Sequence, residues 1–361
     1  MSATTADARA PTGFARWRIV AAGPIVALGI LVWAIVATDS VGLVVRDPDH
    51  VAAQYFVLVG TGVALLVVLD VVLRATRRTG SFPPSRAAMA AVRRERWTPW
   101  RAAAAGSALF AFYVSYMAYR NLKAIVPLAR PGELFDAQLA NFDRAIFAGN
   151  DPATLLHTLM GTGVTTHVLS TAYVAFIVFL PLTIGVSLVF SRDLEAGLFY
   201  TTAQSINWVL GAASYFLLPS LGPVYADPAV FSALPSSEVT HLQGVLMDQR
   251  VAFLAHPASA TPQAIAAFAS LHISMSFSAA VAAHLLGLGQ RLKVALWTWF
   301  GVTMLGTIYL GWHYVADNVA GVIMGAMALA LAGLLTGVDL RTARTRRAGL
   351  VAVGDVAAAT S

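Results

Sequence analysis

The stretch GWHYVADNVAG, residues 311–321, ends one long apolar run and opens the next. It places His313 and Asp317 four residues apart at the edge of what the surrounding sequence indicates is a membrane. An ionisable pair costs free energy there unless partners hold it, so its presence favours a functional role. The alternative is that Trp312, His313 and Tyr314 belong to an interfacial aromatic belt and that Asp317 is simply hydrated.

The composition excludes an ordinary soluble enzyme. Hydrophobic residues make up 58% of the 361 residues and charged residues 12%, whereas about 25% are charged in a typical globular protein. The formal net charge is +6, but the basic residues cluster between apolar runs, which favours positive-inside membrane topology over nucleic-acid binding. The sequence contains no cysteine, which excludes disulfides, thiolate metal sites and a cysteine nucleophile. Abundant alanine and a strong preference for arginine over lysine are typical of a GC-rich bacterial genome.

Runs of about 20 apolar residues predict membrane-spanning helices. The first run follows two arginines, as in a signal peptide, but it is too long and no small-residue cleavage site follows, so we expect it to be retained. The sequence therefore predicts an all-α integral membrane protein with about eight spans. The runs lie near residues 19–38, 51–73, 102–122, 164–190, 197–218, 266–288, 294–312 and 316–336.

The distribution of basic residues predicts the orientation of these spans. The segment 74–101 holds eight arginines and is expected to be cytoplasmic. Alternation through eight spans then places both termini and 18 of the 24 basic residues in the cytoplasm. Arg120, Lys123 and Arg130 are a local exception, because they lie close together on the outer side.

Two long segments are predicted to lie outside the membrane on the same face. Residues 219–265 are rich in proline, serine and histidine, which favours a lid or an acceptor-binding loop. Residues 123–163 include FDAQLANFDRAIFAG, which predicts an amphipathic helix on the membrane surface. Its apolar residues at helical spacing are Phe135, Leu139, Phe142 and Ile146.

Three polar clusters reach this outer face from three different spans. They are YRNLKAIVPLARP (119–131), FASLHIS (268–274) and WHYVAD (312–317). The cations Lys123 and Arg130 are suited to neutralise phosphate oxygens. The second cluster begins a predicted helix, whose free N–H groups favour an anion.

The two histidines of these clusters are suited to phosphoryl transfer. On a helix, Asp317 lies on the same face as His313, so it can bind one ring nitrogen and leave the other as a nucleophile. His272 can protonate a leaving oxygen and later activate an acceptor hydroxyl. This set of groups needs neither a metal nor another cofactor.

These ordered residues resemble the type 2 phosphatidic acid phosphatase superfamily, whose motifs are K-x6-R-P, P-S-G-H and S-R-x5-H-x3-D. The resemblance covers residues 120–330. It implies a six-helix catalytic core and a His313 nucleophile that forms a phosphohistidine, is oriented by Asp317 and is assisted by His272. It also implies that the phosphate ligands are Lys123, Arg130 and Ser270.

One departure concerns the third motif, where Gly306 and Thr307 stand in place of Ser-Arg. Without that arginine the sequence looks more like the branch that contains inositol phosphorylceramide synthases, which move a phosphorylated headgroup between lipids. A phosphodiester carries one negative charge, whereas a monoester carries up to two. A site with one cation fewer therefore favours a phosphodiester, which is the substrate of headgroup transfer. Arg120 is a candidate to replace the missing arginine.

The expected organisation is a two-span extension with a basic cytoplasmic loop (1–101), a catalytic core (102–337) and a basic cytoplasmic tail (338–361). The expected function is lipid phosphotransfer at the extracytoplasmic face of a bacterial plasma membrane. The substrate would be a phospholipid or lipid phosphate, and the acceptor a lipid alcohol or inositol. The alternatives are a phosphatase of phosphatidate or polyprenyl phosphate and, in another class, a transporter or non-catalytic membrane protein.

The Gly321-x3-Gly325 pattern predicts close helix packing.

Overall fold

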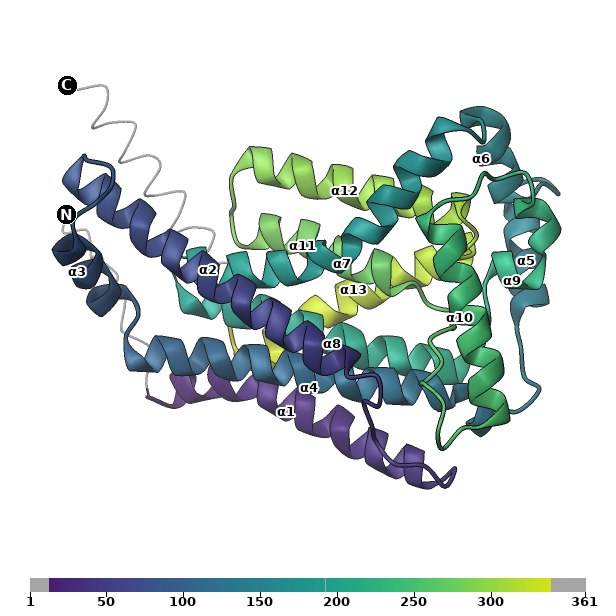
Figure 1. The fold of residues 1–361 in the computed structure, drawn as a ribbon, viewed down its shortest axis with the longest axis horizontal. Coiled ribbons are helices and arrows are strands. Elements are labelled where there is room, and N and C mark those ends of the chain that lie inside the picture. The colour runs from purple at the N-terminus through teal and green to yellow at the C-terminus, as the bar shows by residue number, and fades with distance from the viewer. Residues whose placement is uncertain (1–12, 192, 339–361) are drawn as a thin grey trace, which may run out of the picture.

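The computed structural model describes residues 13–191 and 193–338. Within these ranges the chain forms only helices and connecting loops (Figure 1), which confirms the all-α prediction. Nearly all of the predicted tail, 338–361, lies outside the described residues.

Each predicted apolar run overlaps one helix of the structure. These helices form the bundle: α1 (Gly13–Asp39), α2 (Val51–Thr79), α4 (Pro99–Ala129), α7 (Val164–Phe190), α8 (Leu194–Leu217), α11 (Leu271–Leu285), α12 (Gln290–Tyr309) and α13 (Val315–Thr336). The shorter elements are α3 (Arg86–Arg96), α5 (Asp136–Ile146), α6 (Pro152–Met160), α9 (Pro223–Ala226), the 3-10 helix η1 (Pro228–Phe231) and α10 (Glu238–Ala255).

Five of the described helices, α1, α2, α4, α7 and α13, are long and apolar enough to cross a membrane. The number eight therefore stays a prediction. Of the remaining three bundle helices, α11 is short and α8 carries buried polar residues such as Gln204 and Asn207. A helix that is surrounded by protein does not need an apolar surface on every side.

Helix α8 lies at the centre of the bundle, where it contacts α1, α4, α7, α11 and α13. Most of its residues are buried, and they form the middle of the main hydrophobic core. Helix α1 packs along α4 and α8, so it is part of the same bundle. Helix α2 is peripheral and leaves large apolar side chains exposed, including Val57, Leu58 and Leu65. Such an apolar surface fits contact with lipid.

Two glycines let α11 and α13 approach each other closely, which confirms the packing predicted for Gly321 and Gly325. A Cβ atom at Gly321 would lie 2.6 Å from the carbonyl oxygen of Ser270, and one at Gly325 would lie 2.6 Å from that of Ser274. The close approach places the first turn of α11 against the first turn of α13. These two turns carry His272 and Asp317.

The short helices other than α3 gather at the end of the bundle opposite α3 (Figure 1). The amphipathic helix expected in 123–163 is α5, in which Phe142 and Ile146 are 51% and 58% exposed. Its buried face includes Asp136 and Asp143. The segment 219–265 contains the 18-residue helix α10 and is therefore not simply a loop.

Candidate active site

The turn between α12 and α13 carries His313. The backbone N–H groups of Trp312 and His313 both donate to the carbonyl oxygen of Thr307, at 3.0 and 3.2 Å. Gly311 has a φ of 73°, a left-handed conformation that glycine adopts without steric cost. A side chain at Gly311 would also clash with the ring of Phe231, at 2.6 Å. The chain therefore reverses tightly and presents a buried His313.

His313 and Asp317 form the pair that their spacing predicted. Nδ1 of His313 lies 3.3 Å from Oδ2 of Asp317, and both side chains are buried. The same Oδ2 accepts a hydrogen bond from the N–H of Tyr314 at 3.0 Å. The other carboxylate oxygen, Oδ1, is buried and has no hydrogen-bond partner among the described residues. Asp317 is thus placed to orient the imidazole through Nδ1.

The environment of His313 keeps its imidazole neutral. Burial lowers the pKa of His313 to about 3, and the positive charge of Lys123 acts in the same direction. A hydrogen bond with the backbone of Ala267 opposes these two effects. A neutral imidazole retains a free lone pair at neutral pH, as a nucleophile requires.

His272 lies in the first turn of α11, with its ring centroid 6.0 Å from that of His313. Its ring stacks on Tyr173 at 4.5 Å and contacts Phe176 at 4.4 Å. Tyr173 in turn stacks on Trp312 at 5.1 Å. The ring nitrogens of His272 make no hydrogen bond within 13–191 and 193–338. Aromatic packing therefore positions this ring while its nitrogens stay available to a ligand.

Ser270 is the N-cap of α11 and is fully buried. Its hydroxyl accepts a hydrogen bond from the N–H of Ile273 at 3.4 Å. Its own N–H donates to the carbonyl oxygen of Asp317 at 3.1 Å. Ser270 thus joins the beginnings of α11 and α13 beside the two histidines.

Lys123 is a cation without a carboxylate partner. Its Nζ lies 5.2 Å from the ring centre of Tyr215 and 5.9 Å from that of Tyr119. The ammonium group makes no hydrogen bond or ion pair with any residue that the structure describes. Its charge is near enough to His313 to lower the pKa of that residue. A shielded cation supported only by aromatic rings favours an anionic ligand.

The two arginines proposed as phosphate ligands bind elsewhere in the structure. Arg130 pairs with Glu133 and donates to the carbonyl oxygen of Phe216. Arg120 pairs with two carboxylates of the α1–α2 loop, Asp47 at 2.7 Å and Asp49 at 2.9 Å. The structure thus places neither guanidinium in contact with the two histidines.

Thr307 occupies the position of the missing arginine and is fully buried. Its hydroxyl accepts a hydrogen bond from Nδ2 of Asn318 at 3.1 Å. Its carbonyl oxygen also accepts hydrogen bonds from the N–H groups of Trp312 and His313. Thr307 therefore stabilises the turn, but it supplies no positive charge.

Two carboxylates of α5 hold the same turn and were absent from the predicted site. Asp143 accepts hydrogen bonds from the N–H groups of Val315 at 2.7 Å and Ala316 at 3.0 Å. Asp136 accepts one from the hydroxyl of Tyr314 at 3.1 Å, and others from the backbone at 221–222. Burial raises the pKa of Asp143. The sequence did contain a signal for these residues. Two aspartates seven residues apart in a predicted amphipathic helix lie on one face of that helix, so they could have been predicted to act together.

The residues of 13–191 and 193–338 contain no group of three or more His, Asp or Glu side chains arranged to hold a metal ion. A model of the PAP2 superfamily matches residues 137–331, more than half of the chain. The matched segment includes Ser270, His272, His313 and Asp317 and begins after Lys123. No curated protein and no solved structure matches the chain significantly.

Proposed function

The chain belongs to the PAP2 superfamily, and from this premise we propose that it is a membrane-embedded lipid phosphotransferase that works through a phosphohistidine. Its long apolar helices fit a membrane enzyme of this superfamily. The substrate would be a phospholipid, and the acceptor a lipid alcohol or inositol.

One observation carries the proposal. Lys123 and His272 both lie near His313, and the side-chain nitrogens of neither residue make a hydrogen bond or ion pair with another described residue. His313 itself is neutral and oriented by Asp317. Two basic side chains that contact only aromatic rings, beside an oriented nucleophile, are an arrangement that favours a bound phosphate.

The geometry supports a two-step reaction. In the first step, His272 takes up a proton from solvent as the negatively charged phosphate group binds beside it. Nε2 of His313 then forms a bond to phosphorus while the bond to the leaving oxygen breaks, and His272 gives its proton to that oxygen. In the second step, an acceptor hydroxyl gives its proton to His272 as its oxygen bonds to phosphorus, and the phosphorus–nitrogen bond breaks. Asp317 stabilises the positive charge that develops on the His313 ring, and Lys123 stabilises the phosphate oxygens.

The charge of the site favours a phosphodiester over a monoester. Among the described residues, Lys123 is a cation whose charge acts on His313, whereas Arg120 and Arg130 are paired with carboxylates. Thr307 adds no charge at the position of the superfamily arginine. A single cation balances the one negative charge of a phosphodiester better than the two of a monoester. This supports headgroup transfer over hydrolysis of phosphatidate or polyprenyl phosphate.

The site is proposed to open on the extracytoplasmic face of a bacterial plasma membrane, with both termini cytoplasmic. The His313 turn lies beside α5, at the end of the bundle opposite the arginine-rich helix α3 (Figure 1). Basic segments favour the cytoplasmic side, so their position at the far end supports this orientation.

The proposal is tested with purified protein and a panel of labelled phospholipids, with and without diacylglycerol or inositol. We expect a new phospholipid to form only when an acceptor is present. Release of free phosphate from a monoester lipid, independent of any acceptor, would show that the protein is a phosphatase. No product from any lipid, together with no phosphate bound to the protein, would contradict both activities.

A further inference from the structure

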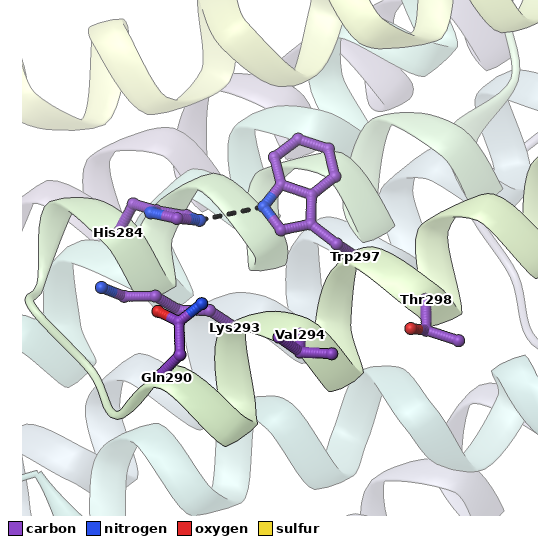
Figure 2. A pocket seen from close by; sticks show the side chains of 6 residues that line it. All are labelled: His284, Gln290, Lys293, Val294, Trp297 and Thr298. Carbon is purple, nitrogen blue, oxygen red and sulfur yellow. Dashed lines mark hydrogen bonds between the residues drawn. The ribbon is translucent and has the colours of Figure 1, made fainter.

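A second candidate site lies at the other end of α11. A cleft of about 420 Å³ separates the last turn of α11 from the first turns of α12 (Figure 2). Its lining residues are His284, Gln290, Lys293, Val294, Trp297 and Thr298. His284 follows His272 by twelve residues on the same helix, a distance of about 18 Å. The cleft is therefore separate from the candidate active site.

The polar groups of the cleft are mainly hydrogen-bond donors. Nε1 of Trp297 donates to Nε2 of His284 at 2.9 Å (Figure 2), so a neutral His284 carries its proton on Nδ1 and presents a donor there. Figure 2 shows the ends of Lys293 and Gln290 on the same side of the cleft as the His284 ring. The ammonium group of Lys293 has no hydrogen bond or ion pair with any described residue, and no carboxylate lines the cleft. Its chemistry therefore favours an anion.

The remaining wall of the cleft is apolar and open to the surroundings. Val294 is 55% exposed and Trp297 is 37% exposed, on the outer surface of α12. Leu292 is also exposed on this helix. A ligand with both a negative charge and a hydrocarbon part can satisfy both kinds of surface, and tryptophan is enriched where headgroups and hydrocarbon meet.

We propose that this cleft binds the phosphate headgroup of an anionic phospholipid in the leaflet away from the active site. Lys293, the Nδ1–H of His284 and the Gln290 amide would bind the phosphate, and an acyl chain would lie along Val294 and Trp297. Basic pockets between helices at the cytoplasmic side of membrane proteins have this composition. The proposal does not depend on the catalytic activity, because it shares no residue with the active site.

The test uses the full-length protein in a neutral detergent, with bound lipid counted by native mass spectrometry. Phosphatidylglycerol, phosphatidylcholine and inorganic phosphate are titrated in separate arms. We expect phosphatidylglycerol to bind preferentially, and Lys293→Gln to weaken its binding about fivefold, as expected for one cation near a membrane surface.

The matched control is Arg291→Gln, which removes the same charge from an exposed position two residues away that does not line the cleft. This variant should retain the binding of the native protein. Equal losses in the two variants would mean that general positive charge attracts the lipid, and would overturn the site. Equal binding of phosphatidylcholine, or binding of inorganic phosphate as tight as that of the lipid, would overturn the assignment of the ligand. Elution of both variants as native-like particles excludes misfolding as the cause of a loss.

Discussion

At the scale of single residues, burial of His313 determines the protonation state of its imidazole. A buried imidazole loses the hydration that would stabilise its charged form, so the neutral form dominates at neutral pH. Asp317 supplies a carboxylate at the ring nitrogen that does not react, and one of its oxygens stays without a partner among the described residues. In the proposed reaction, Asp317 would therefore stabilise the positive charge that develops on the ring when the other nitrogen bonds to phosphorus.

Replacement of His313 tests the proposed nucleophile. We expect His313→Ala to abolish the acid-labile phosphate that forms on the native protein with a labelled lipid, and to lower turnover by more than about 10³-fold. The control is His241→Ala, a change at an exposed histidine of α10. The labelling is followed by acid quench and gel autoradiography. Native labelling in His313→Ala would contradict the assignment.

The depressed pKa of His313 predicts a pH dependence of stability. The unfolded imidazole takes up a proton as the pH falls below about 6.5, whereas the folded one resists until about 3. The contribution of the neutral ring is therefore complete above pH 6.5 and decreases towards pH 3, by at most about 1.4 kcal/mol per pH unit. Thermal unfolding in detergent between pH 7.5 and 4.5 should show a smaller decrease for His313→Gln than for the native protein. Parallel curves would argue against a buried neutral His313.

At the scale of elements, α5 contacts the turn before α13 through two carboxylates. Asp143 binds the first two N–H groups of α13, which no intrahelical acceptor can satisfy. Asp136 on the same face binds Tyr314. Because Tyr314 and Val315 directly follow His313, these contacts with α5 help to position the side chain of His313.

Asp143→Ala is expected to affect both stability and catalysis. Loss of a capping carboxylate costs about 1 kcal/mol, and a displaced turn should lower kcat by about tenfold with a smaller change in KM. The matched control is Asp151→Ala, because Asp151 caps α6 through Thr154 and does not touch the His313 turn. Thermal unfolding and turnover are measured for both. If the two variants lose the same turnover, α5 has no specific effect on the site.

The crossing of α11 and α13 depends on a glycine. Gly321→Ala would place a Cβ atom 2.6 Å from the Ser270 carbonyl oxygen, and we expect such overpacking to destabilise the protein by about 1–3 kcal/mol and to separate His272 from His313. Gly333→Ala on the same helix has nothing within 4 Å of the added atom and should be neutral or slightly stabilising. Thermal unfolding and turnover of the two variants test this difference. Equal stability would show that the helices can separate without cost.

At the scale of the whole molecule, the distribution of charge predicts the orientation. The absence of cysteine makes this measurable, because a single introduced cysteine is the only thiol. Ser81, beside α3, and Ser232, beside α10, are both exposed. In intact cells, a membrane-impermeant maleimide should label Ser232→Cys at once and Ser81→Cys only after permeabilisation. The reverse pattern would place the active site in the cytoplasm and contradict the proposed orientation.

The helices of the bundle and α5 could be predicted from the sequence, since apolar runs and helical spacing depend on local composition. Helix α10 was missed, because the segment 219–265 that contains it is rich in proline, serine and histidine. The three polar clusters at the ends of spans could also be recognised from local composition. The residues that pair with the cations of these clusters could not be predicted. Arg120, for example, pairs with residues more than 70 positions earlier in the chain. Periodicity carries no information about such contacts.

The sequence by itself thus determined an all-α membrane protein of the PAP2 superfamily and the candidate residues His272, His313 and Asp317. Only the tertiary structure decided that Lys123 lies beside His313 with no carboxylate partner, while Arg120 and Arg130 are bound elsewhere. It also decided that the carboxylates of α5 face inwards. The physical reason is that motif spacing follows the chain, whereas ion pairs and capping bonds form between whichever groups the helix packing brings together.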